Sequence, residues 1–258
     1  MLAIIGGSGL YQLDGLTMET QHEVTTPFGQ PSSSITEGRY LGQPVLFLAR
    51  HGEGHQFLPH EVNYRANIFA LKSVGARRIL GFSAAGSLRK EIRPGELALT
   101  AQYFDHTRGK RNYSFFGDGV SAHISTAYPT CPALRADIVD AAARINAPVH
   151  VDKTYACVEG PRLGTRAESF FLRDSAQCDL VGMTNVPEVF LAREAQLAYC
   201  TLCLVTDYDC WMDDPAEHVS VDKFFATYQG TLTKAQAILT ELLRQPLRPT
   251  PNEVRQSL

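Results

Sequence analysis

The feature that most constrains the fold is a series of short, almost unbroken apolar runs. Strands with one face in water alternate apolar and polar residues, whereas strands covered on both faces do not. Segments with helical periodicity lie between these runs, and the clearest of them extends over residues 221–242. The sequence therefore predicts an α/β fold in which helices flank a mixed central β-sheet.

The predicted elements run through most of the chain. Strands are expected at residues 2–5, 45–49, 78–83, 96–100, 153–158, 180–183 and 199–206. Helices are expected at residues 63–73, 133–145, 165–176, 187–195 and 221–242. Neither a repeat nor a linker divides the chain, so we expect one domain over residues 1–243. Three closely spaced prolines follow, and they predict a loosely ordered tail over residues 244–258.

Composition argues against several classes of protein. The net charge of -3 gives no general attraction to nucleic acid or anionic lipid. No stretch approaches the roughly 20 apolar residues of a membrane helix. The first residues lack the basic region and cleavage site of a signal peptide. We therefore expect a cytoplasmic protein that binds neither nucleic acid nor membranes.

The cysteines and histidines give little support for a metal site. Cys200 and Cys203 form a CxxC pair inside an apolar run, and no second pair follows that would complete a zinc site. The eight histidines form neither an HxH nor an HExxH motif. We expect the two thiols to be buried in the core, with redox chemistry or zinc binding as the alternative, and we expect no bound metal.

Small, hydroxyl or basic residues follow several predicted strands. The first strand leads into a glycine-rich turn that contains Ser8, and the second is followed by Arg50 and His51. Ser83 ends the third strand, and Thr184 follows the strand at 180–183. Ligands of open α/β sheets bind at the carboxyl ends of strands, and the forked donors of arginine match phosphate. These positions predict a site for a phosphate-sized anion.

Simpler interpretations of the same residues remain open. The glycine-rich turn also fits a plain tight turn, and it fits a dinucleotide site less well because the G-x-G-x-x-G spacing is absent. Arg50 also fits an ordinary surface ion pair with a carboxylate.

Two carboxylates follow the apolar run at 199–206. Asp207 and Asp209 are two positions apart, so an extended chain would place both side chains on the same side. Two close carboxylates do not both ionise easily, so the pKa of one rises. Such a carboxyl donates a proton while its neighbour accepts a hydrogen bond. The pair fits either an acid that protonates a leaving base or an Asx-turn or capping cluster, and the spacing alone does not decide.

Ordered motifs from residue 1 to about 240 resemble the trimeric purine nucleoside phosphorylase family. The motifs are GGSGL (6–10), TPFG (26–29), ARHG (49–52), VNYRAN (62–67), EGPR (159–162) and MTNVPE (183–188). Within that family, TDYDCW (206–211) and HVSVD (218–222) are similar to the S-methyl-5'-thioadenosine phosphorylase branch.

The resemblance implies a reaction in which phosphate attacks the ribosyl C1' and the purine leaves. The expected products are adenine and 5-methylthioribose 1-phosphate, which would place the enzyme in purine and methionine salvage. The resemblance also implies that phosphate is a co-substrate, that no metal or organic cofactor is used, and that the chain forms a homotrimer.

The resemblance also assigns roles to individual residues. Asp207 would protonate or hydrogen-bond N7 of the purine, and Asp209 would accept from its 6-amino group. The residues assigned to phosphate are Ser8, Arg50, His51, Ser83, Ala84 and Thr184. Those assigned to the nucleoside are His55, Leu163, Met183, Val221, Phe224, Phe225 and His123, the last from a neighbouring subunit.

Leu163 departs from the family pattern, which often has an aromatic residue at this position. Relatives specific for methylthioinosine share Gly-Pro-Arg-Leu but differ at Asp-Tyr-Asp. A phosphorylase of S-methyl-5'-thioinosine or of general purine nucleosides is therefore an alternative. A nucleosidase, a non-catalytic nucleoside-binding protein and a Rossmann dehydrogenase are further alternatives. Arg50 and His51 argue against the nucleosidase, because water does not need an anion site.

Overall fold

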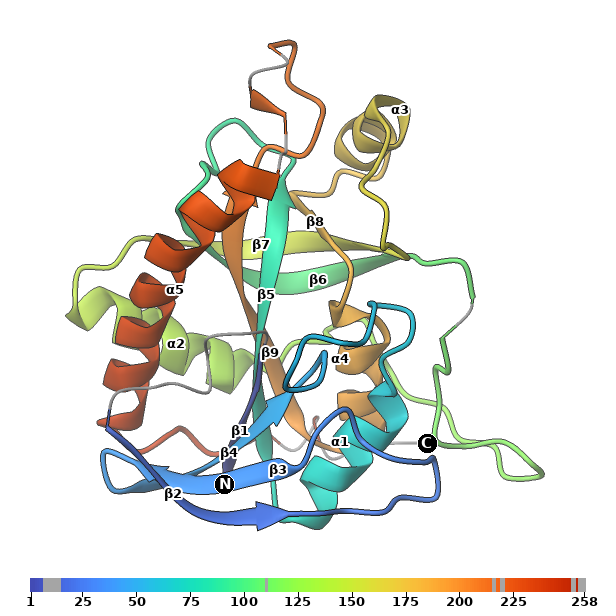
Figure 1. Ribbon diagram of the computed structural model, residues 1–258, viewed down its shortest axis with the longest axis vertical. Coiled ribbons are helices and arrows are strands. Elements are labelled where there is room, and N and C mark those ends of the chain that lie inside the picture. Colours follow the sequence, from blue (N-terminus) through green and yellow to red (C-terminus); the bar gives the residue numbers. More distant parts are fainter. Residues whose placement is uncertain (7–14, 110, 215–216, 219–220, 252–253, 255–258) are drawn as a thin grey trace.

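The computed structural model describes residues 1–258 except 7–14, 110, 215–216, 219–220, 252–253 and 255–258, and it leaves the side chains of residues 221 and 223 undescribed. The described part is an α/β fold built on one mixed nine-stranded sheet with helices on both faces (Figure 1). The predicted fold class is confirmed.

The strands and helices have the following bounds. The strands are β1 (Leu2–Gly6), β2 (Leu16–His22), β3 (Ile35–Tyr40), β4 (Gln43–Ala49), β5 (Arg78–Ser87), β6 (Leu97–His106), β7 (Val149–Val158), β8 (Leu180–Gly182) and β9 (Ala198–Asp207). The helices are α1 (Tyr64–Ser73), α2 (Pro132–Arg144), α3 (Arg166–Phe170), α4 (Asn185–Glu194) and α5 (Val221–Leu243), and a π-helical turn, η1 (Phe171–Ser175), follows α3.

Strand β5 joins the two parts of the sheet. The strand order is β2-β3-β4-β1-β5-β8-β7-β6-β9, and β9 pairs again with β5. The last five strands in this order therefore close on themselves as a small barrel, while β2, β3, β4 and β1 extend from β5 as an open sheet. Strand β5 is parallel to β1 and β9, and its end pairs antiparallel with β8. The open sheet therefore joins β5 along its amino-terminal half, and the carboxyl end of β5 pairs with β8 and β9 inside the barrel.

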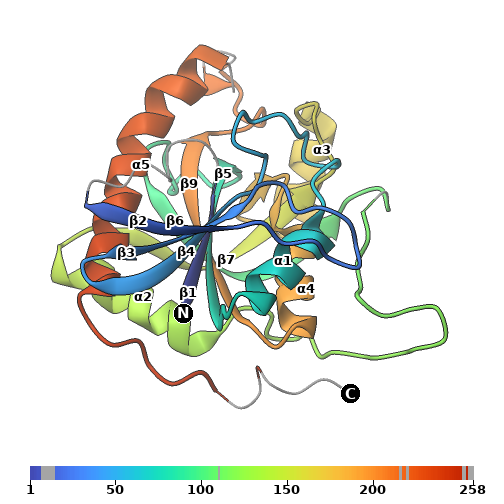
Figure 2. The same cartoon turned by 60° about the horizontal axis from the view of Figure 1, so that its bottom comes forward.

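Helices cover the sheet from two sides, as Figure 2 shows: α2 and α5 lie on one side, and α1 and α4 lie on the other. Each side has its own apolar cluster. Cys200 belongs to the cluster beneath α2 and α5, whereas Cys203 belongs to the cluster beneath α1 and α4. Residues three apart in a strand point to opposite faces. The prediction of two buried core thiols is confirmed, and their placement excludes a disulfide or shared metal.

The apolar runs in the sequence did not predict strands β2 and β3. Most β2 side chains are exposed, and the strand forms one edge of the sheet, so it carries no continuous apolar run. The helix predicted over 165–176 is real but changes from α-helix to π-helix after Phe170. Thr165 caps this helix in a reciprocal capping box with Glu168, which fixes where the helix begins.

The described part of the expected tail is anchored. Nη1 of Arg248 lies 2.7 Å from Oδ1 of Asp137 on α2, and Val254 is buried in the core. The division of the chain at residue 243 stays a prediction. Among the described helices, none has both the length and the apolar character needed to cross a membrane.

Candidate active site

A cavity of about 590 Å³ lies at the carboxyl ends of β4, β5, β8 and β9. Of the strand ends predicted to share a site, those of β4, β5 and β8 contribute residues to this space, whereas the turn after β1 lies outside the described residues. That the space binds an anion stays a prediction. The predicted site residues that line it are Arg50, His51, His55, Ser83, Ala84, Leu163, Met183, Thr184, Asp207, Asp209, Phe224 and Phe225.

Three predicted residues are not placed in this cavity. Ser8 lies outside the described residues, and so does the side chain of Val221. His123 is described, but it is exposed and does not line the cavity. Within the described ranges, no cluster of three or more histidine, cysteine or acidic side chains has the arrangement of a metal site.

Arg50 lies almost fully buried at the end of β4. Its Nε and Nη2 donate to the two carboxylate oxygens of Glu188 at 2.7 and 2.8 Å, and Nη1 donates to the carbonyl oxygen of Phe82 at 2.7 Å. Burial opposes the charge, but the Glu188 carboxylate outweighs it and raises the pKa of Arg50. The ion pair is therefore buried, not a surface pair. One N–H on each of Nη1 and Nη2 is left for a ligand.

His51 is held as a neutral imidazole. Its Nδ1 lies 2.8 Å from the carbonyl oxygen of Phe57, and its ring stacks on His55 with centroids 4.4 Å apart. A carbonyl oxygen only accepts, so Nδ1 carries the proton. Burial, reinforced by the charge of Arg50, lowers the pKa of His51 to about 4. Nε2 is therefore an acceptor near pH 7, and a phosphate bound there must bring a proton or give one to the ring.

Three hydroxyl groups meet beside this arginine and histidine pair. Oγ of Ser83 lies 3.1 Å from Oγ1 of Thr184 and 3.3 Å from the hydroxyl oxygen of Tyr155. Burial raises the pKa of Tyr155 well above its usual value, so its hydroxyl stays protonated. A Cβ at Gly182 would overlap this hydroxyl, so the close approach of β7 and β8 requires glycine there.

The aspartate pair is built by a turn. Asp207 is the last residue of β9, and the backbone N–H of Asp209 donates to Oδ1 of Asp207 at 2.7 Å. Asp209 has a φ of 53°, so the prediction from extended geometry is wrong. An Asx turn brings both carboxylates to the same cavity. The Asx-turn interpretation therefore describes the local backbone correctly, and the same turn also places both carboxylates in the cavity.

Both carboxyl groups sit in a weakly solvated environment. Burial is the main cause that raises the pKa of Asp207 and of Asp209. The Thr206 hydroxyl donates to Oδ2 of Asp207 at 2.7 Å and partly offsets that effect. The negative charge of Asp207 adds to the raised pKa of Asp209. A raised pKa favours the protonated form of a carboxyl, which can donate a hydrogen bond. The catalytic role of the pair stays a prediction.

The start of α5 gives the cavity an apolar wall. The ring of Phe224 stacks on Tyr228 with centroids 5.6 Å apart, and both line the cavity. Phe225 and Leu163 also line it, yet they are 65% and 52% exposed. An apolar ligand group or a further protein surface would cover these side chains.

Sequence reasoning missed two supporting residues, Glu188 and Tyr155. Glu188 is 1% exposed on α4 and fixes the orientation of Arg50, while the Tyr155 hydroxyl contacts the Ser83 hydroxyl and accepts from the backbone N–H of Thr184. The one available signal was the acidic residue at the end of the MTNVPE motif, inside the otherwise apolar stretch 186–192.

Comparison with known proteins identifies the family of this chain. The profile of the phosphorylase superfamily matches residues 1–244. The chain belongs to the phosphorylase superfamily, and it is an enzyme of the nucleoside phosphorylase type, a pentosyltransferase. It is 44% identical to S-methyl-5'-thioadenosine phosphorylase of Hyperthermus butylicus, with 98% of this chain and 91% of that protein covered. It is 45% identical to the Geobacter sulfurreducens protein of the same name, with 95% and 85% covered.

Solved structures of methylthioadenosine phosphorylases are also similar to this chain. Methylthioadenosine phosphorylase from Schistosoma mansoni in complex with adenine superposes with a TM-score of 0.89 at 36% identity, with 94% of this chain and 90% of that one covered. Methylthioadenosine phosphorylase from an antarctic soil metagenomic library gives 0.88 at 44% identity, with 94% and 85% covered. Within the superfamily, the chain belongs to the S-methyl-5'-thioadenosine phosphorylase branch.

Proposed function

We propose that the protein catalyses phosphorolysis of S-methyl-5'-thioadenosine to adenine and 5-methylthioribose 1-phosphate. The observation that carries the proposal is one cavity with two chemically different ends. Arg50, Ser83 and Thr184 supply donors for an oxyanion, and Asp207 and Asp209 supply buried carboxyl groups. A nucleoside phosphorylase needs both ends at once, because it must hold phosphate and also protonate or hydrogen-bond the departing base.

The proposed reaction uses the cavity in the following way. Phosphate held by Arg50, His51, Ser83, Ala84 and Thr184, together with Ser8, attacks C1' from one side. The transition state carries positive charge on the sugar, which the phosphate faces, and negative charge on the leaving purine. A hydrogen bond to N7 stabilises that negative charge.

The two aspartates have separate proposed roles. Asp207, whose pKa is raised by burial, donates to N7 of the purine. Asp209 accepts a hydrogen bond from the 6-amino group, which favours adenine over a 6-oxo purine.

The proposed sugar site follows from the apolar wall. Met183 would lie against the ribose, with His55 near its 5' end. Phe224, Phe225 and Val221 would surround the methylthio group, and Leu163 would contact the base. An apolar wall favours a methylthio group over a hydroxyl group, because burying an unpaired hydroxyl is costly.

We also propose that the enzyme is a cytoplasmic homotrimer that works in purine and methionine salvage without a metal or organic cofactor. The exposed Phe225 and Leu163 support a neighbouring subunit at the cavity, and His123 would reach the substrate from that subunit. Light scattering of the purified protein tests the trimer. A His123→Ala variant that stays trimeric should lose kcat/KM for the nucleoside, and a fully active variant would contradict the shared site.

The central experiment measures base release from S-methyl-5'-thioadenosine and from S-methyl-5'-thioinosine, with phosphate and after its removal. We expect adenine release that depends on phosphate, with the inosine compound a poor substrate. Faster hypoxanthine release would overturn the assignment of Asp209. Release without phosphate would overturn the proposed anion site and would indicate a nucleosidase. Retention of activity after dialysis against EDTA is the expected result for a metal-free reaction.

A further inference from the structure

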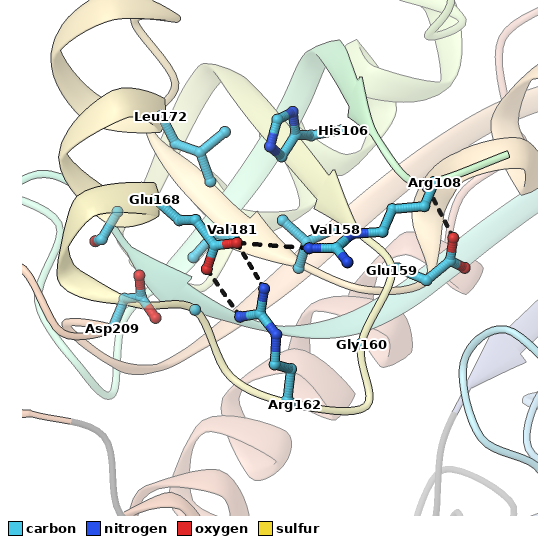
Figure 3. A pocket seen from close by; sticks show the side chains of 12 residues that line it. His106, Arg108, Val158, Glu159, Gly160, Arg162, Glu168, Leu172, Val181 and Asp209 are labelled. Atoms are coloured by element: carbon cyan, nitrogen blue, oxygen red, sulfur yellow. Dashed lines mark hydrogen bonds and ion pairs between the residues drawn. The ribbon is translucent and has the colours of Figure 1, made fainter.

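A second, smaller chamber adjoins the substrate cavity at Asp209. Its volume is about 140 Å³, and it shares Asp209, Gly164, Val158 and Val181 with the larger cavity. In Figure 3, Asp209 lies at one end of the chamber beside Glu168. The two spaces therefore meet at the residue that, in the proposed function, accepts a hydrogen bond from the purine amine.

Gly164 leaves the junction between the two chambers without a side chain. A Cβ there would lie 3.8 Å from Oδ2 of Asp209 and 3.9 Å from Oε2 of Glu168, which are ordinary contact distances. The backbone at Gly164 is also outside the left-handed region. Neither sterics nor backbone conformation requires glycine at this position. A side chain at this position would instead point toward Asp209, which lines both chambers, and toward Glu168 of the second chamber.

The walls of the second chamber combine apolar side chains with charged groups that pair with one another. Val158, Val181 and Leu172 supply apolar surface. Nη1 and Nη2 of Arg162 donate to the two oxygens of Glu168 at 2.8 and 2.6 Å, so this charged pair is already satisfied.

Further charged and aromatic side chains complete the walls of the second chamber. The backbone N–H of Arg108 donates to Oε2 of Glu159 at 2.8 Å. Figure 3 shows His106 and Arg162 on opposite sides of the chamber, with the Arg108 guanidinium between them and its Nη2 3.9 Å from Oε1 of Glu168. A guanidinium group also packs favourably on an aromatic ring.

The volume of the second chamber sets the size of the group that it can hold. A cavity of about 150 Å³ holds a benzene molecule, so the second chamber holds one six-membered ring or a short alkyl chain. We propose that the enzyme also cleaves 6-amino purine nucleosides that carry one alkyl or benzyl substituent on the amine, with that substituent in the second chamber. This inference rests on the proposed function.

The chemistry of the reaction is unchanged for such a substrate. The bond between C1' and N9 breaks, a bond from C1' to a phosphate oxygen forms, and the purine leaves with the electron pair. The purine gains one proton, which is balanced by the proton that phosphate loses. A singly substituted amine keeps one N–H for Asp209, whereas a doubly substituted amine has none.

The test compares S-methyl-5'-thioadenosine with its N6-methyl, N6-benzyl and N6,N6-dimethyl derivatives, each with phosphate. We expect kcat/KM for the N6-benzyl compound to stay within roughly tenfold of the unsubstituted nucleoside, since its ring enters preformed space. The N6,N6-dimethyl compound should fall roughly tenfold or more below the N6-methyl compound, because its hydrogen bond to a carboxylate is lost.

Variants at Gly164 test the route into the chamber. Gly164→Val should lower the ratio of kcat/KM for the N6-benzyl compound to that for the parent nucleoside by roughly tenfold or more, and Gly164→Ala should lower it less. Gly230→Ala is the matched control, because Gly230 lies on α5 with open space around it. This control should leave the ratio unchanged. If Gly164→Val does not fold, the kcat/KM ratio of Gly164→Ala and the series of N6-substituted nucleosides still test the proposal.

The outcomes separate the two proposals. Cleavage of the parent nucleoside without cleavage of the N6-benzyl compound would overturn the second chamber as a substituent site and would leave the proposed function intact. An unchanged ratio in both Gly164 variants would also overturn it. Failure to cleave the parent nucleoside itself would overturn the proposed function.

Discussion

Replacing Glu188 with glutamine tests whether a buried carboxylate orients Arg50 for phosphate. The two Glu188 oxygens accept from Nε and Nη2 of Arg50, and Oε1 also accepts from the Tyr199 hydroxyl at 2.7 Å. Glutamine keeps the shape, but it removes the charge and turns an N–H₂ group toward a donor. Removing one partner of a buried ion pair costs about 3–5 kcal/mol. Because the amide oxygen still accepts, we expect Glu188→Gln to lower the free energy of unfolding by about 3 kcal/mol.

The assay combines urea unfolding with phosphate kinetics. Glu19→Gln is the control, because Glu19 pairs with Arg39 at 2.9 Å while both side chains are about half exposed. That change should cost less than about 1 kcal/mol. Phosphate should stabilise the wild type through binding to the folded state, and it should stabilise Glu188→Gln much less. The KM for phosphate should rise roughly tenfold or more in Glu188→Gln.

Two results would refute this reasoning. A loss of stability as small as that of Glu19→Gln would show that the buried pair does not stabilise the fold. A full loss of stability with an unchanged KM for phosphate would show that Glu188 stabilises the core without orienting Arg50.

Three further predictions follow from the site. Asp209→Asn should raise the kcat/KM ratio of methylthioinosine to methylthioadenosine by roughly tenfold, because an amide can donate to a 6-oxo group; an unchanged ratio contradicts the assignment. Gly182→Ala should cost about 1–3 kcal/mol in thermal unfolding, since its Cβ meets the Tyr155 hydroxyl; wild-type stability would show that the two strands separate freely. His51 binds a proton near pH 6.5 when unfolded but only near pH 4 when folded, so it stabilises the fold above pH 6.5, and that contribution is lost as pH falls to 4. Between pH 6.5 and pH 4, the urea midpoint of His51→Asn should fall less than that of the wild type. An equal fall would show that His51 does not cause the loss of stability at low pH.

The sequence predicts the parts of this fold that depend on continuous burial. All ten residues of β9 are buried, so the strand appears as an apolar run. Strand β2 is exposed along most of its length and is held by pairing with β3, which leaves no apolar run to recognise. Pairing partners at a sheet edge are set by the folded arrangement of distant segments, and a local pattern does not record them.

The candidate site likewise contains some residues that the sequence predicts and others that it does not. Residues directly after strands were predictable, because the carboxyl ends of strands gather in space. Glu188 meets Arg50 across 138 positions, and Tyr155 meets Ser83 across 72, so neither contact has a local signal. The second chamber was not predictable either, since an empty space is a property of packing and has no sequence pattern of its own.

The position of β5 has a consequence for how the protein unfolds. This strand is hydrogen-bonded to β1, β9 and β8, and Ser83 and Ala84 lie on it beside the cavity. Loss of the barrel or of the open sheet would each strip β5 of partners, so neither part can detach while the anion site survives. Hydrogen exchange of the β5 amides should therefore proceed only through global unfolding, and phosphate should slow exchange in both parts of the sheet to the same degree.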